Sequence, residues 1–231
     1  MTQSRGFPLS TRTMVTRRSP RKPSLAVKKM PAQQRATETY ELILDVAAKM
    51  LADVGIERLS TNMVCEQAGL TPPALYRYFP NKYALLSELA QRLMQRQNEL
   101  IPQWITPQVL TGSTADLEQA LAGLLLDTYK LTKQTPGGVW ILRALRAVPT
   151  LQKVRLDSHT LVTDAQGQML IEVFPNVPEK DLLLVGRIAV DMIYAGVELL
   201  FDAPLNSRDV ANVIAAMVAS HLIRLQSGTV R

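Results

Sequence analysis

Nine basic side chains and no acidic ones lie in the first 35 residues, a composition suited to binding a polyanion such as nucleic acid or an anionic membrane surface. The remaining 196 residues carry 17 basic and 20 acidic groups, so the formal net charge of +6 belongs to this N-terminal stretch. A solvated tail without a partner is the alternative, because a run of charge is a weak signal alone. The basic residues are Arg5, Arg12, Arg17, Arg18, Arg21, Lys22, Lys28, Lys29 and Arg35.

Side chains that could act as nucleophiles or metal ligands are scarce. Cys65 is the single cysteine, and one thiol forms neither an internal disulfide nor a cysteine-based zinc site. The two histidines, His159 and His221, are far apart in the sequence. There is no Gly-x-Ser-x-Gly motif and no glycine-rich phosphate loop. We therefore expect no enzymatic activity, no metal and no cofactor, and we expect Cys65 to be a small buried core residue.

The spacing of apolar residues predicts helices from Arg35 onward, and no segment alternates in the manner of a β-strand. In the first helix six apolar residues are spaced for one face, and Gly55 follows them as a C-terminal glycine. These six are Leu42, Ile43, Val46, Ala47, Met50 and Leu51. Residues 1–34 lack this periodicity and are expected to form a disordered basic arm.

Two short helices and one longer helix are expected next. Ser60 or Thr61 caps the second helix, which ends before Gly69. Thr71 caps the third helix, whose first turn tolerates the pair 72–73 because prolines there lack only N–H groups that have no acceptor. Pro80-Asn81 ends it and starts a fourth helix, from residue 82 to about 100.

The rest of the chain is predicted to form further helices at 117–133, 139–147, 150–173, about 178–201 and about 207–225. Three pairs of polar residues are spaced for N-terminal capping, namely Ser113 with Asp116, Asn176 with Glu179, and Asn206 with Asp209. No apolar run reaches the roughly 20 residues that span a bilayer, and the N-terminus lacks the apolar core of a secretory signal. We therefore expect a cytoplasmic protein with no membrane contact.

Three short helices followed by a longer one, within about 50 residues, are the arrangement that a helix-turn-helix DNA reader requires. The turn is the segment 67–71. Gly69 can take a left-handed conformation, Ala68 permits close approach, and Leu70 can fill the space between the two helices. The third helix of such a unit presents its outward face to the major groove.

Residues 39–86 resemble the DNA-binding domain of the tetracycline-repressor (TetR) family. The most specific motifs are Ala68-Gly69-Leu70 and the run Leu75-Tyr76-Arg77-Tyr78-Phe79-Pro80-Asn81-Lys82. The resemblance covers about a fifth of the chain. It departs from the family at Val64-Cys65, where Ile-Ala is usual, and at the less usual Pro72-Pro73. The resemblance implies an all-α fold, with an N-terminal helix-turn-helix DNA-binding domain and a C-terminal helical domain for ligand binding and dimerisation.

The resemblance also implies which residues contact DNA. Arg77 is the foremost candidate for a base contact, because arginine pairs with guanine through two hydrogen bonds, and the Asn62 amide could pair with adenine. Contact with phosphate or solvent alone is the alternative for Arg77, and a core position is the alternative for Tyr78. Helix N-termini favour anions, which suits the expected phosphate contact of Lys82. The full set is Thr61, Asn62, Thr71, Pro72, Pro73, Ala74, Tyr76, Arg77, Tyr78 and Lys82.

For the second half of the chain the resemblance implies an architecture and an unidentified small-molecule ligand. Asp191 and Tyr194 interrupt an apolar helix, where polar groups are costly unless they are paired, so they could line a pocket. The alternatives are a core position for Trp140, ion pairs for Arg143 and a solvent-exposed position for His159. The expected pocket set is Tyr129, Trp140, Arg143, His159, Met169, Asp191 and Tyr194.

Dimerisation is expected through the last two helices, at about 178–201 and 207–225. Both are rich in apolar residues, and small residues such as Gly196 and Ala215 allow close helix approach. Two helices from each subunit would form a four-helix interface with two-fold symmetry, which matches a palindromic operator. The resemblance thus implies a ligand-responsive transcriptional regulator, usually a repressor, released from DNA by a small-molecule inducer.

The domain boundaries expected from the sequence are 1–34 for the basic arm, 35–82 for the DNA-binding domain and 83–231 for the helical ligand-binding and dimerisation domain. Between Arg35 and Lys82 there are five basic and six acidic residues, so the DNA-binding domain itself is not basic. The arm could therefore supply much of the electrostatic affinity for DNA. A helical interaction module that binds no DNA and a membrane-associated protein are the alternative functions.

Overall fold

The computed structural model describes Leu25 and residues 34–228, so the expected basic arm lies almost wholly outside the described residues. All regular secondary structure in the described part is helical, which confirms the predicted all-α fold. The helices are α1 (Gln34–Arg58), α2 (Thr61–Ala68), α3 (Pro72–Tyr76), α4 (Lys82–Asn98), α5 (Ile101–Trp104), α6 (Pro107–Thr111), α7 (Thr114–Gln134), α8 (Gly138–Ala147), α9 (Gln152–Val173), α10 (Glu179–Asp202) and α11 (Ser207–Gln226).

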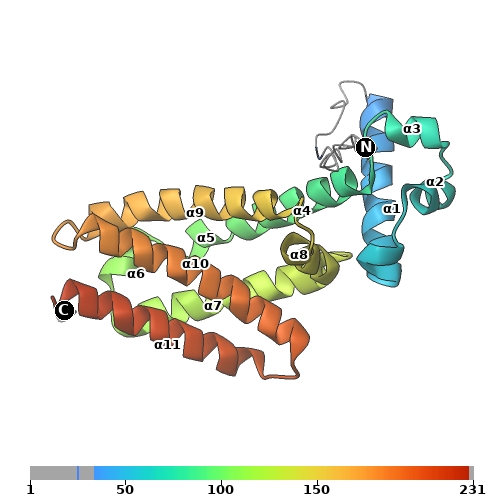
Figure 1. The fold of residues 1–231 in the computed structure, drawn as a ribbon. Helices are drawn as coiled ribbons and strands as arrows, with labels where there is room; N and C mark the ends of the chain where they lie inside the picture. The colour runs from blue at the N-terminus through green and yellow to red at the C-terminus, as the bar shows by residue number, and fades with distance from the viewer. Residues whose placement is uncertain (1–24, 26–33, 229–231) are drawn as a thin grey trace, which may run out of the picture.

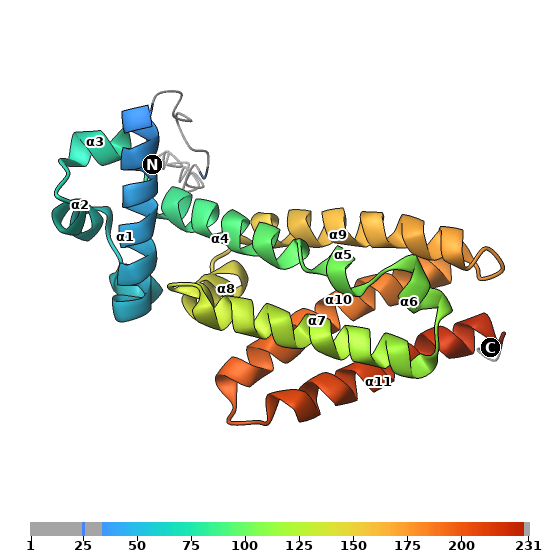
Figure 2. The same ribbon diagram turned by 180° about the vertical axis from the view of Figure 1, so that it is seen from behind.

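The molecule is elongated, with two units joined by α4 (Figures 1 and 2). Helices α1, α2 and α3 form a small unit at one end, and α5 to α11 form a larger bundle. Helix α4 contacts α1 at one side and α7, α8 and α9 at the other, so it belongs to both units by packing. Within the bundle α7 packs along α11, and α9 packs along α10.

The buried face of α1 differs from the predicted stripe. Leu42 is 43% exposed, whereas Tyr40, Leu44 and Ala48 are buried together with the expected Ile43, Ala47 and Leu51. The face is wider on one side because α2, α4 and α8 all pack against α1. Gly55 also does more than end the helix, since its backbone is non-helical at φ 74° and ψ 178° and a last turn runs on to Arg58.

Three of the five expected N-terminal caps are present. The Ser60 side chain accepts a hydrogen bond from the Met63 N–H, Ser113 and Asp116 form a reciprocal capping box, and the Asn206 side chain accepts from two N–H groups. The prediction for Asn176 with Glu179 is wrong, because Pro178 occupies the N-cap position and no side chain caps α10. Thr71 holds the N-cap position of α3 without a side-chain hydrogen bond.

The two short helices α5 and α6 were not predicted from the sequence. They have four and five residues, and each begins with a proline in its first turn. Trp104 fixes α5 on α7, because its indole N–H donates to Asp127 at 2.9 Å and its ring covers Gly123. A Cβ atom on Gly123 would lie 2.4 Å from that ring, so the close approach requires glycine.

Candidate nucleic-acid interface and ligand cavity

The turn between α2 and α3 has the geometry expected of a helix-turn-helix. Gly69 is left-handed at φ 64° and ψ 31°, and the Leu70 N–H donates to the Cys65 carbonyl at 2.9 Å. Beneath the turn, Leu75 and Phe79 are fully buried, and the Tyr40 ring stacks on Phe79 at 5.0 Å. Cys65 is buried as well, and burial raises the pKa of its thiol, which keeps it protonated.

The outward face of this unit presents most of the expected DNA-contacting residues. Asn62, Tyr76 and Arg77 are exposed, as are Thr71 and the pair Pro72 and Pro73. The Thr61 and Tyr76 hydroxyls lie 3.0 Å apart and tie α2 to α3. A face with an amide, a guanidinium and hydroxyl groups can hydrogen-bond to base edges and phosphate oxygens.

Tyr78 and Lys82 are placed differently. Tyr78 is 4% exposed, and its ring meets Tyr40 edge-on, with ring centroids 5.9 Å apart. The Lys82 ammonium donates to the carbonyls of Ile56, Glu57 and Leu59 at 3.3–3.4 Å, so it holds the end of α1. Ala74 and Thr61 are half-buried between the exposed residues. Tyr78 thus occupies the core position given above as its alternative, and Lys82 has a structural contact that sequence reasoning missed.

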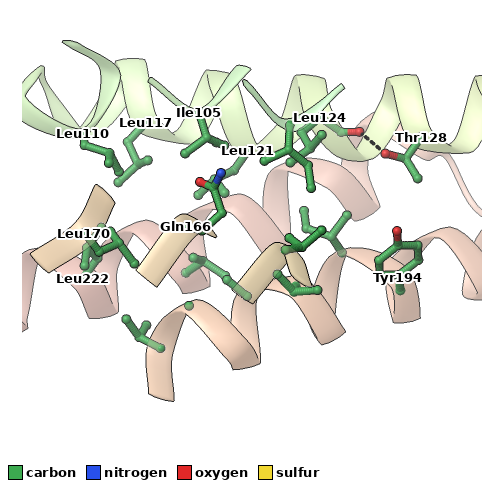
Figure 3. A pocket seen from close by; sticks show the side chains of 18 of the residues that line it. Ile105, Leu110, Leu117, Leu121, Leu124, Thr128, Gln166, Leu170, Tyr194 and Leu222 are labelled. Carbon is green, nitrogen blue, oxygen red and sulfur yellow. Dashed lines mark hydrogen bonds between the residues drawn. The ribbon is translucent and has the colours of Figure 1, made fainter. Parts of the chain in front are cut away.

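A cavity of about 90 Å³ lies inside the larger bundle (Figure 3). Its lining comes from α4, α5, α6, α7, α9, α10 and α11. The lining is mainly aliphatic, and among the described residues it includes no Asp, Glu, Lys, Arg or His. The polar members are Gln97, Thr128, Gln166 and Tyr194.

Of the seven residues expected in a pocket, the structure places Tyr194 in the lining of this cavity. Tyr129 packs on Phe201 with ring centroids 4.8 Å apart, and Met169 is half-buried against the core. Trp140 and Arg143 lie on α8, where the indole covers Gly55 and the guanidinium pairs with Asp202 at 3.0 Å. The lining residues that sequence reasoning missed are mostly aliphatic and come partly from the unpredicted segment 101–110.

His159 and Asp191 lie directly behind Tyr194. The imidazole stacks on the Tyr194 ring at 4.7 Å and is 1% exposed, and its Nδ1 lies 2.9 Å from Asp191 Oδ1. Burial lowers the pKa of His159 more than Asp191 raises it, so the ring is neutral near pH 7 and donates from Nδ1. Burial raises the pKa of Tyr194, whose hydroxyl donates to Asn98 Oδ1 at 3.4 Å.

The described residues contain neither a membrane span nor a metal site. No described helix is both long enough and apolar enough to cross a membrane. No group of three or more acidic, histidine or cysteine side chains in the described part could hold a metal ion.

Comparison with known proteins identifies the DNA-binding unit. Residues 43–89 match the family described as bacterial regulatory proteins, tetR family. The chain is 43% identical over 54 residues to the tetracycline repressor protein class C of Escherichia coli. This aligned segment covers 23% of this chain and 25% of that protein. It is 26% identical over 200 residues to the A-factor receptor protein of Streptomyces griseus. This alignment covers 81% of this chain and 64% of the receptor.

Solved structures extend the similarity to the fold of the larger bundle. A tetR-family transcriptional regulator from Streptomyces coelicolor superimposes with a TM-score of 0.61 at 18% identity, over 84% of each chain. A second regulator of this family, from Mesorhizobium loti, has a TM-score of 0.61 at 15% identity and covers 83% of this chain and 98% of that one.

The turn geometry and the bundle that follows it define a helix-turn-helix protein with a second helical domain. Residues 43–89 match the DNA-binding unit of the tetR family of bacterial regulatory proteins, and the fold of the chain is that of solved tetR-family regulators. Its match to the first of the curated relatives spans only about a quarter of that repressor's length.

Proposed function

We propose that this protein is a ligand-responsive transcriptional regulator that binds a palindromic operator as a dimer. One observation carries the proposal: α4 contacts α1 through Lys82 at its start and Arg92 at its middle, and near its end it bears Gln97, a side chain in the lining of an internal apolar cavity. A ligand-responsive regulator needs both a DNA-binding unit and a ligand site that can change the affinity of this unit for DNA. No catalytic step forms part of this proposal, and a protein that binds the bacterial chromosome would act in the cytoplasm.

Arg77 is proposed as the principal base-reading residue, with Asn62 as the second. Both are exposed on the face that a helix-turn-helix presents to the major groove. Tyr76, Thr61 and Thr71 would then bind phosphates. Pro72 and Pro73 occupy the first turn of α3, where they could contact a thymine methyl group but donate no N–H. Lys82 and Tyr78 would stabilise this surface through their contacts with α1.

The dimer interface is proposed on the outer faces of α10 and α11. Five large apolar side chains on these two helices are 44–59% exposed, namely Leu184, Ile188 and Leu199 on α10 and Val213 and Met217 on α11. Exposed apolar residues that gather on adjacent helices mark an interaction surface. A two-fold dimer presents two DNA-binding units to the two half-sites of a palindromic operator.

Repression with release by a ligand is the proposed mode of regulation. A ligand in the cavity can weaken operator binding only if it binds a non-binding conformation more tightly. An apolar cavity of about 150 Å³ holds a benzene-sized molecule. Because this cavity is about 90 Å³, most ligands would require the surrounding helices to move, and α4 is one of them.

The test is enrichment of genomic DNA fragments by the purified full-length protein. Wild type is expected to enrich a short palindrome, and Arg77→Ala is expected to lose that enrichment. Arg208→Ala is the matched control, because Arg208 is exposed on α11, in the larger bundle. If wild type enriches no site, or if Arg77→Ala enriches the same site equally, the proposed reader is wrong.

The arm at residues 1–34, which lies outside the described part except for Leu25 and Gln34, is proposed to add electrostatic affinity for DNA. Removing it is expected to reduce the slope of log affinity against log salt concentration, since each neutralised phosphate contributes about −0.9 to that slope. An unchanged slope would show that the arm makes no such contact.

A further inference from the structure

Three of the four polar residues that line the cavity lie toward one of its ends, and the fourth, Gln166, lies nearer the other end (Figure 3). Figure 3 shows Leu110, Leu117, Leu170 and Leu222 at one end and Thr128 with Tyr194 at the other. Gln97 belongs to the second end, because its amide bonds to Thr132, one helical turn from Thr128 on α7. The cavity therefore has one mainly aliphatic end, where Gln166 is the polar side chain, and one end with several hydrogen-bonding groups.

Gln97 presents a free acceptor to this end. Its side chain is 1% exposed, and its Nε2 donates to Thr132 Oγ1 at 2.8 Å. The Thr132 hydroxyl hydrogen is already committed to the Thr128 carbonyl at 2.7 Å, so Thr132 can only accept from Gln97. This fixes the orientation of the amide and leaves Oε1 buried without a partner among the described residues.

An unpartnered buried acceptor is costly, and native proteins rarely keep one without a reason. The neighbouring groups do not satisfy it. The Thr128 hydroxyl donates to the Leu124 carbonyl at 2.7 Å, and the Tyr194 hydroxyl donates toward Asn98. A ligand that brings its own donor to this end of the cavity would satisfy the Gln97 oxygen.

We infer that the ligand is an uncharged, mainly aliphatic molecule with a hydrogen-bond donor, such as a hydroxyl or an amide N–H, at one end, which bonds to Gln97 Oε1. This inference rests on the proposed function, in which the cavity is the ligand site. An anion is disfavoured because the described residues of the lining include no cationic side chain, and a buried unpaired charge is expensive. The aliphatic end takes the chain of the ligand.

The position of Gln97 gives the bond a regulatory consequence. Gln97 lies near the end of α4, five residues beyond Arg92, whose guanidinium binds both carboxylate oxygens of Glu41 on α1 at 2.6 and 2.8 Å. The ligand's donor thus attaches directly to the helix that holds the DNA-binding unit. A ligand that lacks the donor would occupy the cavity without this attachment.

The test is a titration of the methyl-labelled full-length protein, followed by NMR, with 1-hexanol, its isomer methyl pentyl ether, and hexanoate. The two isomers have the same atoms, but only the alcohol can donate. Since a net hydrogen bond contributes about 0.5–1.5 kcal/mol, the alcohol is expected to bind roughly 2- to 12-fold more tightly than the ether. Hexanoate is expected to leave the methyl signals of the cavity unchanged.

Gln97→Leu is expected to abolish the preference for the alcohol while keeping the ether's affinity, and Gln91→Leu, exposed on the same helix, is the control. Equal binding of the isomers to wild type, tight binding of hexanoate, or no binding by any probe would overturn the inference. Operator enrichment is measured on the same samples. If the protein enriches the operator but shows no preference for the alcohol, only the inferred ligand class is wrong. If it prefers the alcohol but enriches no operator, only the proposed regulatory function is wrong.

Discussion

At the scale of single residues, Gly55 shows how one backbone conformation shapes the joint between the two units. Its φ of 74° with ψ of 178° is a combination that is essentially restricted to glycine. The bend lets the Trp140 ring on α8 approach to 3.4 Å from the position where a Cβ atom would stand. The same residue therefore bends α1 and makes room for the bundle.

Gly55→Ala is expected to lower the free energy of unfolding by about 1–3 kcal/mol, the cost of holding a non-glycine residue in such a region. Urea denaturation measures it. Gly228→Ala is the control, because Gly228 is also left-handed, at φ 66°, but lies in open space near the chain end. Equal losses in the two variants would mean that the bend at Gly55 is not specifically required.

The buried His159 leads to a second prediction for a single residue, which concerns the pH dependence of stability. Burial lowers the pKa of its imidazole, and Arg155 and Arg187 add to this, while Asp191 opposes it. The unfolded chain, where the pKa is near 6.5, then binds more protons than the folded chain as pH falls below that value. Stability from the neutral ring is fully present above about pH 6.5 and is lost as pH decreases through the folded pKa.

His159→Phe, which keeps an aromatic ring against Tyr194, is expected to lose less stability than wild type between pH 7.5 and 5.5. Urea midpoints at several pH values check this. His221→Phe retains His159 and is expected to keep the wild-type difference. A wild-type pH dependence in His159→Phe would show that other groups cause the acid sensitivity.

At the scale of helices, the ties of α4 to α1 decide whether movement in the bundle reaches the DNA-binding unit. Arg92 binds Glu41 on α1 through two hydrogen bonds and also pairs with Glu88 one turn earlier on its own helix. Its guanidinium lies 5.6 Å from the Tyr40 ring centre. Arg92 thus fixes the angle between the two helices more firmly than a single charge pair would.

Arg92→Met is expected to weaken this tie, lowering stability by roughly 1 kcal/mol because the pair is partly exposed. The variant should also hold the operator less tightly without any ligand. Lys153→Met is the matched control, since the exposed Lys153–Asp157 pair lies within α9 alone. The tie is unimportant if both variants bind DNA as wild type does.

The sequence predicted some helical features well, and the reasons differ from residue to residue. Caps at Ser113 and Asn206, and at Ser60 or Thr61, are predictable because such oxygen atoms meet N–H groups two or three residues away, and the structure assigns the cap of α2 to Ser60. Asn176 was wrong because Pro178 moved the start of the helix. Helices α5 and α6 are shorter than two turns, so no apolar periodicity can reveal them.

The exposed face of α2 and α3 could be predicted from the sequence because its residues lie within some 20 positions of one local motif, and their contacts with DNA stay a prediction. The cavity could not be predicted, because its lining is assembled from seven helices, and an aliphatic residue such as Leu110 has the same pattern whether it lines a cavity or fills a core. Tyr194 could be predicted because it is a polar interruption of an apolar helix, and it does line the cavity. Gln97 was missed because a glutamine on a helix rich in polar residues is normally exposed.

At the scale of the whole molecule, the apolar residues of α10 and α11 divide into two sets that the sequence could not separate. Leu182, Val185 and Val197 are buried within the protomer, whereas Ile188 and Met217 are exposed. Burial in the core accounts for the first set alone. In the dimer proposed above, a second copy of the chain would cover this second set of residues.

Met217→Glu is therefore expected to convert the protein to a monomer, because a carboxylate in an apolar interface cannot be paired. Sedimentation velocity measures the mass, and operator affinity should fall with it, since a monomer engages one half-site. Leu161→Glu is the control, as Leu161 is 68% exposed on α9, compared with 58% for Met217, and lies off the proposed interface. A Met217→Glu variant that remains dimeric would place the interface on another face, and the paired spacing of the two readers would then have to arise from that face instead.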